Sequence, residues 1–333
     1  MNVFFIGMGY MGFERFKAIS ALRKRYNLKI IGFYDPNVKS VKFKDLKFKS
    51  ENSVSNEYLK KNKISFCIIS VPHNQVFKYA SICLKSNLNI NLLIEKPMGL
   101  NYKESKKIIL LKKKHQKIFI GLNYRYFQGI SCMLRDIKKK KFGKINSILI
   151  NFGHGHNPNM RKSWKLQKRY AGGGAILDPG IHILNLVQLF CSDIKIKFIK
   201  KIKNFWKTGV EEEVLMVLSS KEIPIINISI SILRWRSTFQ IFGNGIKGYW
   251  RLSGRDRSYG NQKYVVGKRW GWLSGKKQKL TEKIISNSKE KNIFLKETVS
   301  IIKTIKNSKI KQLPCNDLEA LKTMKLIKNL YAH

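Results

Sequence analysis

Gly7-Met8-Gly9-Tyr10-Met11-Gly12 follows directly on the apolar run Val3-Phe4-Phe5-Ile6 at the start of the chain. The apolar run predicts a buried strand, residues 11–26 predict a helix, and residues 29–34 predict a second strand. A Gly-x-Gly-x-x-Gly turn that joins the strand to the helix within such a unit is typical of a dinucleotide-binding fold.

Each glycine of this turn has its own role in binding a dinucleotide. Gly7 permits the tight turn, Gly9 lets the backbone approach the pyrophosphate, and Gly12 allows the helix to pack closely on the strand. Tyr10 and Met11 open the helix, whose first N–H groups and partial positive charge attract phosphates. We therefore expect all five residues to border the cofactor.

Asp35 ends the second strand, where a carboxylate can accept the ribose hydroxyls of NAD and repel the 2′-phosphate of NADP. NAD is therefore the expected cofactor. NADP stays an alternative because Lys39 and Lys42 lie close to Asp35 in the sequence. A second interpretation is that the glycine turn only packs and that Asp35 caps a turn or a helix.

The rest of the first third of the chain alternates apolar runs with helical patterns. Residues 64–71 form a near-continuous apolar run, which predicts a strand buried on both faces. Further helices and strands are expected in alternation over residues 74–85, 91–95, 102–115 and 117–122. This order predicts an α/β fold that starts with a doubly wound parallel sheet, a Rossmann domain over residues 1–122.

From residue 123 onward the predicted strands are longer and follow one another without helices between them. Strands are expected over residues 145–152, 213–218, 225–233 and 237–242, and Asn244-Gly245 predicts a hairpin turn. Helices are expected near residues 176–190 and over residues 293–306 and 316–330. Residues 123–333 are therefore predicted to form an α+β domain with a large, mostly antiparallel sheet, whose last helix is free to pack back on the first domain.

Two segments carry residues suited to chemistry. Glu95-Lys96-Pro97 ends a predicted parallel strand, where ligands bind, so Lys96 is expected to face the nicotinamide and Glu95 to border the cofactor. Residues 172–174 are all glycine and lead to Asp178 and His182, which share a face if the segment is helical. A histidine can accept a hydroxyl proton, and a nearby carboxylate stabilises its charged form. The alternatives are a surface turn at Lys96, and a helix-capping Asp178 with a core His182.

In this order and spacing the three motifs resemble the Gfo/Idh/MocA oxidoreductases, the family of glucose–fructose oxidoreductase and inositol dehydrogenase. Asn123-Tyr124-Arg125 is similar to the segment that opens the family's second domain, and residues 242–248 are similar to its hairpin. The resemblance covers essentially the whole chain. It implies an NAD(P)-dependent enzyme that transfers hydride to or from a sugar, a cyclitol or a related carbonyl, with a second-domain sheet that often serves in oligomerisation.

The resemblance also implies roles for individual residues. Lys96 corresponds to the catalytic lysine that contacts the substrate hydroxyl, His182 to the general acid/base, and Asp178 to its acidic partner. Asn185 departs from the family, because many members carry Asp at this position.

The loop Val71-Pro72-His73-Asn74 departs from the family as well. The family often has a histidine three or four residues after this proline, whereas here His73 follows the proline immediately. Val71, Pro72 and Asn74 are expected to contact the cofactor, although this loop is atypical.

Substrate contacts are expected from Arg125, Arg161, Trp164 and Asn185. Arg161 and Trp164 precede the glycine cluster, as does Lys165, and their side chains suit an anionic or sugar substrate whose ring lies on the aromatic face. The alternative is that this segment is ordinary surface.

The formal net charge of +46 is unusual, and such an excess is also found in proteins that bind nucleic acids or anionic membranes. However, only 13 of the 66 basic residues are Arg, and the lysines are spread along the whole chain. Arg is the residue that binds bases and phosphates in bidentate fashion. We therefore favour compositional bias over a nucleic-acid partner, and assign the aromatic and basic residues 249–272 to sheet edges and an oligomer interface.

The five cysteines are scattered and form no Cys-x-x-Cys pair, which argues against a disulfide framework or a zinc site and predicts no bound metal. The N-terminus enters a strand at once, and no stretch reaches the roughly 18 apolar residues of a membrane span. We expect a cytoplasmic enzyme with a small sugar-like substrate, which forms a dimer or tetramer through the C-terminal sheet. The second hypothesis is a non-catalytic dinucleotide-binding sensor or scaffold, and the third is a basic nucleic-acid-binding protein.

Overall fold

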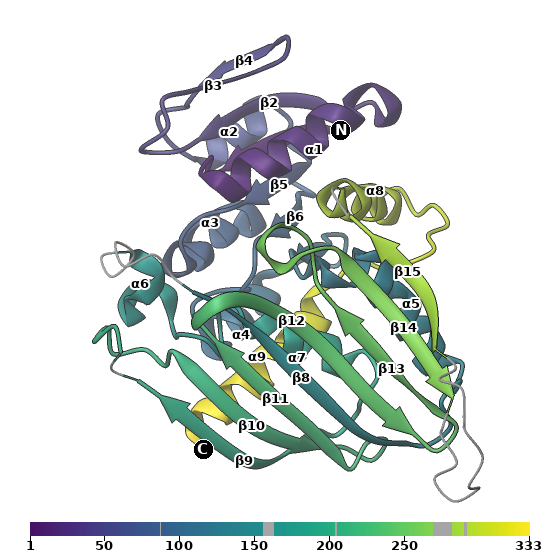
Figure 1. Cartoon of the computed structure of the whole chain (residues 1–333). Helices are drawn as coiled ribbons and strands as arrows, with labels where there is room; N and C mark the ends of the chain where they lie inside the picture. The colour runs from purple at the N-terminus through teal and green to yellow at the C-terminus, as the bar shows by residue number, and fades with distance from the viewer. Residues whose placement is uncertain (87, 156–162, 204, 269–281, 290–291) are drawn as a thin grey trace, which may run out of the picture. The chain divides into compact units, whose positions relative to one another are not determined.

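The computed structural model describes the whole chain except residues 87, 156–162, 204, 269–281 and 290–291 (Figure 1). Its residues form two compact units. The first unit comprises Met1–Asn123, Arg169–Gly172 and Phe294–Lys328, and the second comprises Tyr124–Lys168, Gly173–Ile293 and Asn329–His333. The chain therefore returns to the first unit after it has built most of the second.

A five-stranded parallel sheet forms the centre of the first unit. Its order is β2-β1-β5-β6-β7, and all four pairings are parallel. The strands are β1 (Asn2–Ile6), β2 (Lys29–Tyr34), β5 (Phe66–Ile69), β6 (Asn91–Ile94) and β7 (Ile118–Ile120). Every residue of β5 is buried, as expected for a strand that is covered on both faces. The predicted parallel sheet is confirmed.

Helices of the first unit alternate with these strands. They are α1 (Tyr10–Tyr26) after β1, α3 (His73–Lys85) after β5 and α4 (Tyr102–Leu111) after β6. The strand order reverses between β1 and β5, because the chain continues to β2 on one side and to β6 on the other. Ligands bind outside the carboxyl ends of strands at such a switch point. The glycine turn and the Pro72 loop follow these two strands.

The first unit also contains a hairpin that the hydropathy pattern does not predict. β3 (Ser40–Phe43) and β4 (Leu46–Lys49) pair antiparallel and precede the short helix α2 (Asn56–Lys61). The rings of Phe43 and Phe48 pack edge-on against Phe16 of α1. Lysines separate the apolar residues of this segment, so its sequence resembles a solvated surface.

α8 (Ile293–Ile305) completes the core of the first unit. Its residues Ile301 and Ile302 are fully buried and belong to the same hydrophobic cluster as the side chains of β1. α9 (Asp317–Ala332) begins in the first unit and ends in the second. These helices follow the second unit in the sequence, so the tertiary structure alone assigns α8 to the first.

An eight-stranded sheet forms the second unit, in the order β15-β14-β13-β12-β8-β11-β10-β9. β11 and β8 pair in parallel and the other six pairings are antiparallel, which confirms the prediction of a mostly antiparallel sheet. The strands are β8 (Ile145–Gly155), β9 (Lys195–Ile202), β10 (Glu213–Ser219), β11 (Ile225–Ser231), β12 (Leu233–Gly245), β13 (Gly248–Ser253), β14 (Gln262–Lys268) and β15 (Glu282–Ser288). The longer helices are α5 (Gln128–Lys138) and α7 (Ile181–Gln188).

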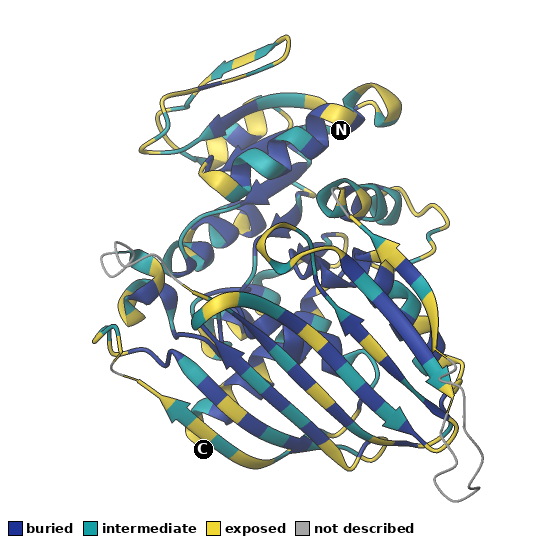
Figure 2. Ribbon diagram, in the orientation of Figure 1, coloured by how far each residue is buried: buried dark blue, intermediate teal, exposed yellow. Residues whose placement is uncertain are grey.

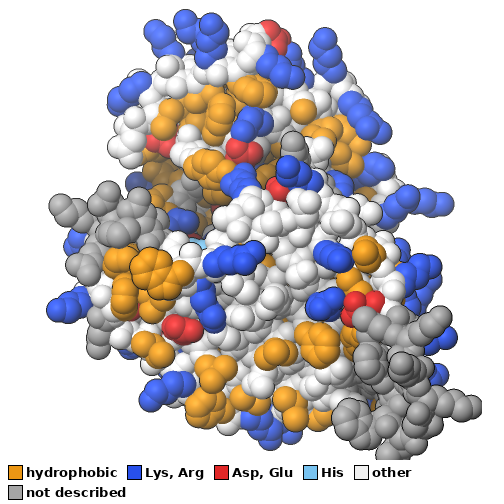
Figure 3. Space-filling view, viewed as in Figure 1, with side chains coloured by type: hydrophobic (Ala, Val, Ile, Leu, Met, Phe, Trp, Pro, Cys, Tyr) orange, Lys and Arg blue, Asp and Glu red, His pale blue; other side chains and the backbone are white. Residues whose placement is uncertain are grey.

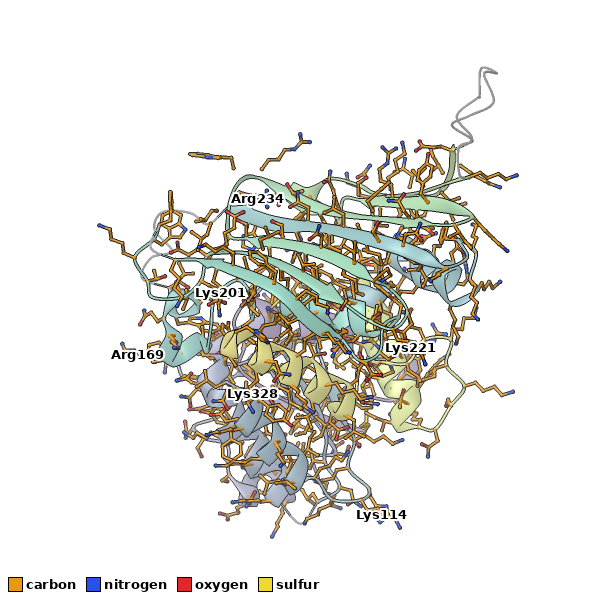
Figure 4. The ribbon with its side chains drawn as sticks, turned by 90° about the horizontal axis from the view of Figure 1, so that it is seen from below. Lys114, Arg169, Lys201, Lys221, Arg234 and Lys328 are labelled. Carbon is orange, nitrogen blue, oxygen red and sulfur yellow. The ribbon has the colours of Figure 1, made fainter. Side chains whose placement is uncertain are left out.

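Buried and exposed residues alternate along the strands of this sheet (Figure 2). In β8, Ile148 and Ile150 are buried, whereas Leu149 between them is 53% exposed. Because side chains of a strand alternate between its faces, one face of the sheet holds the core and the other is turned outward. Lys201 of β9, labelled in Figure 4, donates from Nζ to the Leu330 carbonyl at the end of α9 (3.2 Å).

The hairpin turn between β12 and β13 lies two residues beyond its predicted position. Asn244 pairs with Tyr249, and Gly245 pairs with Gly248, so the turn is Ile246-Lys247. The Asn-Gly pair predicts a turn because both residues tolerate turn conformations. Here both residues still belong to the ladder, so the register of the sheet overrides the local signal.

On the face shown in Figure 3, basic side chains are scattered over both units. A nucleic-acid-binding protein gathers its basic residues on one face or along one helix. The scattered basic residues on this face therefore agree better with compositional bias than with a nucleic-acid-binding surface. Within the described parts of the chain, no helix has both the length and the apolar composition needed to cross a membrane.

Candidate functional site

The glycine turn packs closely on the end of β5 and is open at one residue. Gly7 has a φ of +89°, a conformation that glycine adopts at little cost. A Cβ at Gly12 would collide with the Gly7 carbonyl oxygen, so the turn leaves no room for a side chain there. Gly9 differs, because no atom lies within 4 Å of the position that its Cβ would take. The backbone is therefore approachable from outside at Gly9.

Gly9 is also the N-cap of α1, and it has no side chain to cap the helix. The first turn contains no acidic residue, and Tyr10 is 60% exposed. A helix N-terminus carries partial positive charge and amides without intrahelical partners. An uncapped, acid-free and approachable helix N-terminus fits a pyrophosphate group.

Two buried acceptor atoms lie between the end of β5 and the first turn of α3. Ser70 Oγ and Asn74 Oδ1 are buried and have no hydrogen-bond partner among the described residues. Pro72 is the N-cap of α3, and Val71 Cγ1 lies 3.0 Å from the position of a Cβ at Gly7. Buried polar atoms are rarely left without partners, so these two atoms fit the hydrogen-bonding groups of a bound dinucleotide.

His73 explains the atypical Pro72 loop in structural terms. Its side chain is buried, and its Nδ1 lies 2.7 Å from the Ala171 carbonyl oxygen. Ala171 belongs to the short segment Arg169–Gly172 that returns to the first unit. His73 therefore connects α3 with this segment, a contact that the sequence does not indicate.

Asp35 ties the end of β2 to the glycine turn. Its Oδ2 accepts a hydrogen bond from the Met8 N–H (2.7 Å), and its Oδ1 accepts bonds from the N–H groups of Asn37 (2.8 Å) and Val38 (3.0 Å). The carboxylate thus caps the turn that follows β2. Since a carboxylate offers about four acceptor positions, capacity for one further donor is left. The Nζ of Lys39 binds the Pro36 carbonyl instead of Asp35 (3.2 Å).

Glu95-Lys96-Pro97 begins where β6 ends, and its glutamate belongs to a buried ion cluster. Glu95 lies 2.6 Å from the guanidinium of Arg15 in α1, and Arg15 lies 2.5 Å from Glu297 in α8. We call Arg15, Glu95 and Glu297 the Arg15 triad. The structure directs the Glu95 carboxylate at Arg15, whereas Lys96 is half-buried at the carboxyl end of the strand.

Substitution of Gly12 and of Gly9 is expected to separate packing from cofactor binding. Gly12→Ala should lower the free energy of unfolding by about 1–3 kcal/mol, because the new methyl group collides with the Gly7 backbone. Gly9→Ala should leave thermal stability almost unchanged and weaken NADH binding by about tenfold, because its methyl group occupies the open approach. Thermal unfolding and NADH fluorescence titration measure the two effects. Equal losses of stability in both variants would contradict the assignment.

In the second unit, the glycine cluster is held by Glu211, a residue that sequence reasoning missed. The buried Oε1 of Glu211 accepts hydrogen bonds from the N–H groups of Gly174 and Ile176 (both 3.0 Å) and from the Tyr331 hydroxyl (2.7 Å). The Ala175 N–H binds the Glu211 backbone carbonyl (2.8 Å). One side chain thus shapes the segment that leads to His182.

Loss of this carboxylate should disturb the segment. Glu211→Ala is expected to reduce the free energy of unfolding by about 3 kcal/mol, because two backbone donors lose a charged acceptor in a buried place. Glu211→Gln keeps one acceptor oxygen and should lose less. Denaturant unfolding of both variants measures the difference. If alanine proves as stable as glutamine, the backbone bond through Ala175 alone holds the segment.

The segment that holds Asp178 is not helical, so the condition for a face shared with His182 is not met. α7 begins only at Ile181, because residues 174–180 form turns in which the Asp178 N–H binds the Gly174 carbonyl. The Oδ2 of Asp178 lies 3.5 Å from Lys165 Nζ. His182 is buried in the first turn of α7.

The imidazole of His182 stacks on the ring of Tyr124. The two ring centroids are 4.0 Å apart and the planes differ by 5°. Burial raises the pKa of Tyr124, although the nearby Arg255 lowers it in part, so the phenol stays neutral. Arg255 Nη1 donates a hydrogen bond to the Tyr124 hydroxyl. Tyr124 and Arg255 are further candidate site residues. Tyr124 lies in the segment similar to the family's second-domain start, whereas Arg255 lies in the stretch 249–272, which was expected from the sequence to form sheet edges and an oligomer interface.

Two of the residues expected to contact substrate are in contact with each other. Arg125 Nη2 donates to Asn185 Oδ1 (3.0 Å), and both side chains are buried. Trp164 begins the short 3-10 helix Trp164–Leu166 and is half-buried. Arg161 lies outside the described residues.

Comparison with known proteins gives matches in both units. Residues 1–123 match the family described as "Oxidoreductase family, NAD-binding Rossmann fold", and residues 133–248 match "GFO/IDH/MocA C-terminal domain". Trans-1,2-dihydrobenzene-1,2-diol dehydrogenase of Sus scrofa is 23% identical over 165 residues, 49% of this chain and 47% of the relative. Levoglucosan dehydrogenase of Pseudarthrobacter phenanthrenivorans is 23% identical over 198 residues, 56% of this chain and 50% of the relative.

The chain spans about half the length of the curated relatives that it matches. Among solved structures, an NAD binding oxidoreductase from Klebsiella pneumoniae has a TM-score of 0.79 at 14% identity, with 100% of this chain and 96% of the other covered. At this identity the likeness shows the shared fold. Because the two matched segments lie in the two units in the family's order, the chain belongs to the Gfo/Idh/MocA family of oxidoreductases.

Proposed function

We propose that this chain is an NAD-dependent dehydrogenase or reductase that acts on a CH–OH group or carbonyl of a sugar, a cyclitol or a related compound. The observation that carries the proposal is the open, uncapped N-terminus of α1 at Gly9, in a chain whose two units both match an oxidoreductase family. Two relatives are named as dehydrogenases of levoglucosan and of a cyclic diol, which supports a ring-shaped polyol as substrate.

The first unit supplies the residues that hold the dinucleotide. The amides at the start of α1 bind the pyrophosphate, and the remaining acceptor capacity of Asp35 serves the ribose. The buried oxygens of Ser70 and Asn74 accept hydrogen bonds from the cofactor. When bound, NAD takes up the hydrogen and electron pair that leave the substrate carbon, or returns them in the reverse direction.

Proton transfer is assigned to the second unit. His182 accepts the proton of the substrate hydroxyl, and its stacking on Tyr124 holds the imidazole plane in one orientation. Lys96 polarises and positions the substrate oxygen. Asp178 acts as the acidic partner that favours the charged form of the imidazole.

The test is a screen for the change in absorbance of reduced nicotinamide. The purified chain is mixed with NAD or NADP and with a panel of sugars, polyols, cyclitols and sugar nucleotides. Formation of NADH with at least one cyclic polyol, and faster than formation of NADPH, is the expected result. Tight NADH binding without turnover on the whole panel would favour the non-catalytic sensor instead.

We further propose that the chain forms a homo-oligomer through the outer face of the eight-stranded sheet. The register places Leu215, Ile225 and Phe198 on the same face as Leu149, and each is about half exposed. Figure 3 shows hydrophobic side chains on the second unit. Contiguous exposed apolar residues mark association surfaces. Light scattering should give the mass of a dimer or tetramer, and the double variant Leu149→Lys/Leu215→Lys should be a monomer.

A further inference from the structure

The guanidinium of Arg255 lies among three aromatic rings in the second unit. Its central carbon is 4.3 Å from the ring centroid of Tyr259, 5.0 Å from that of Tyr124 and 5.9 Å from that of Phe152. The hydrogen bond from Nη1 to the Tyr124 hydroxyl adds a fixed direction. The rings and the hydrogen bond together hold this cation beside Tyr124, on which His182 stacks.

Arg255 lacks a counter-ion within the described parts of the chain. The hydroxyls of Tyr124 and Tyr259 accept hydrogen bonds from its guanidinium, and its Nε is buried without a partner. Guanidinium carries five N–H donors, so most of its hydrogen-bonding capacity is unused. An exposed lysine without a partner would be ordinary in a chain with 66 basic and 20 acidic residues. The buried Nε of Arg255 differs from such a lysine, because water does not reach it and cannot accept its hydrogen bond.

The Nε of Arg234 is also buried without a partner, so an unused Nε is not peculiar to Arg255. What the guanidiniums of Arg15 and Arg234 have is a carboxylate nearby. Arg15 binds two glutamates, and Arg234, labelled in Figure 4, binds Ser229 at 2.7 Å and lies 3.5 Å from Glu213. Leaving a buried donor unsatisfied costs stability unless a ligand supplies the acceptor. Arg255 has no such carboxylate among the described residues, which points to a bound group that is not part of the chain.

The fixed charges around Arg255 are positive in sum. Asp178 lies 3.5 Å from Lys165. Its charge also acts on Tyr124, Tyr259 and His154. Arg255 and Lys165 thus carry two positive charges against this one carboxylate. Burial lowers the pKa of the neighbouring His154, and Arg255 and Lys165 lower it further against the opposite effect of Asp178. A histidine is neutral or positively charged, so His154 supplies no negative charge to Arg255. An anion is the group that this environment lacks.

We infer that Arg255 binds a carboxylate or a phosphate carried by the substrate, so that the enzyme acts on an acidic sugar rather than a neutral one. The inference rests on the proposed function, since it assigns a class to the substrate of the same site. Guanidinium binds both groups through paired N–H donors, which is why the two share one recognition chemistry. The anion is held next to Tyr124, whose ring supports His182.

The test compares one sugar in three forms: glucose, glucuronate and glucose 1-phosphate. Kinetics with NAD and calorimetric binding of each sugar are measured for the wild type, Arg255→Met and the matched control Arg257→Met on the same loop. Wild type should prefer one acidic form over glucose by about 30-fold or more in kcat/KM, and Arg255→Met should lose that preference. The preferred acid distinguishes carboxylate from phosphate. Arg257→Met should keep the preference.

Binding and turnover separate the possible failures. If no sugar is oxidised but an acidic sugar still binds in an Arg255-dependent way, the proposed function fails and the anion site stands. If wild type binds and oxidises glucose as well as both acids, or Arg255→Met weakens all three alike, the anion site is overturned. If Arg255→Met does not fold, Arg255→Lys carries the test, because it keeps the charge and loses the paired donors.

Discussion

His182→Ala and Lys96→Ala are each expected to lower turnover by about 100-fold or more. A positioned imidazole that removes the hydroxyl proton contributes to the rate in the transition state, and alanine leaves only solvent water for this task. Lys96 acts on the oxygen of the same substrate hydroxyl through its positive charge. The rate of NADH formation at saturating sugar and NAD measures both effects.

Exposed residues of the same types provide the controls. His115 and Lys114 are exposed in the first unit, and Lys114 is labelled in Figure 4. His115→Ala and Lys114→Ala should keep turnover within about twofold of wild type, as expected of surface positions away from special contacts. Near-normal turnover in both His182→Ala and Lys96→Ala would remove these residues from the proposed chemistry and favour the sensor.

Arg15→Met should lower the free energy of unfolding by about 3–5 kcal/mol. Arg15 is fully buried and pairs with Glu95 and Glu297, which lie far apart in the sequence. Removal of the guanidinium leaves two buried carboxylates without their common partner. Denaturant unfolding followed by circular dichroism measures the loss.

A surface ion pair on the same helix is the control for this variant. Arg23 of α1 pairs with the exposed Asp45. Because water screens such pairs, Arg23→Met should change the stability little in comparison. Equal losses from Arg15→Met and Arg23→Met would show that the Arg15 triad does not hold α1, β6 and α8 together. If only Arg15→Met loses stability and its turnover also falls, the Arg15 triad helps to position Lys96 for catalysis.

The parallel sheet and the glycine turn could be predicted from residues that are close in the sequence. Buried parallel strands are short apolar runs, and the turn must follow the first of them directly. The position of Lys96 at a strand end follows from the same pattern. These features need no knowledge of distant contacts.

The partners of the site residues could not be predicted in this way. Arg255 binds a tyrosine 131 residues away in the sequence, and Glu211 binds Gly174, which is 37 residues away. No periodicity joins such positions. Asp178 and His182 show the converse case, since their spacing of four suggests a helix that the turns of residues 174–180 exclude.

The sequence by itself determined the fold class, the glycine turn and the residue types available for chemistry. Each of these depends on local spacing, because hydrophobic period and turn preference act over a few residues. Only the tertiary structure decided that α8 returns to the first unit, that Glu95 pairs with Arg15, and that Arg255 lies beside Tyr124. Burial of charge and of aromatic rings depends on which distant elements pack together, and local sequence spacing does not encode that.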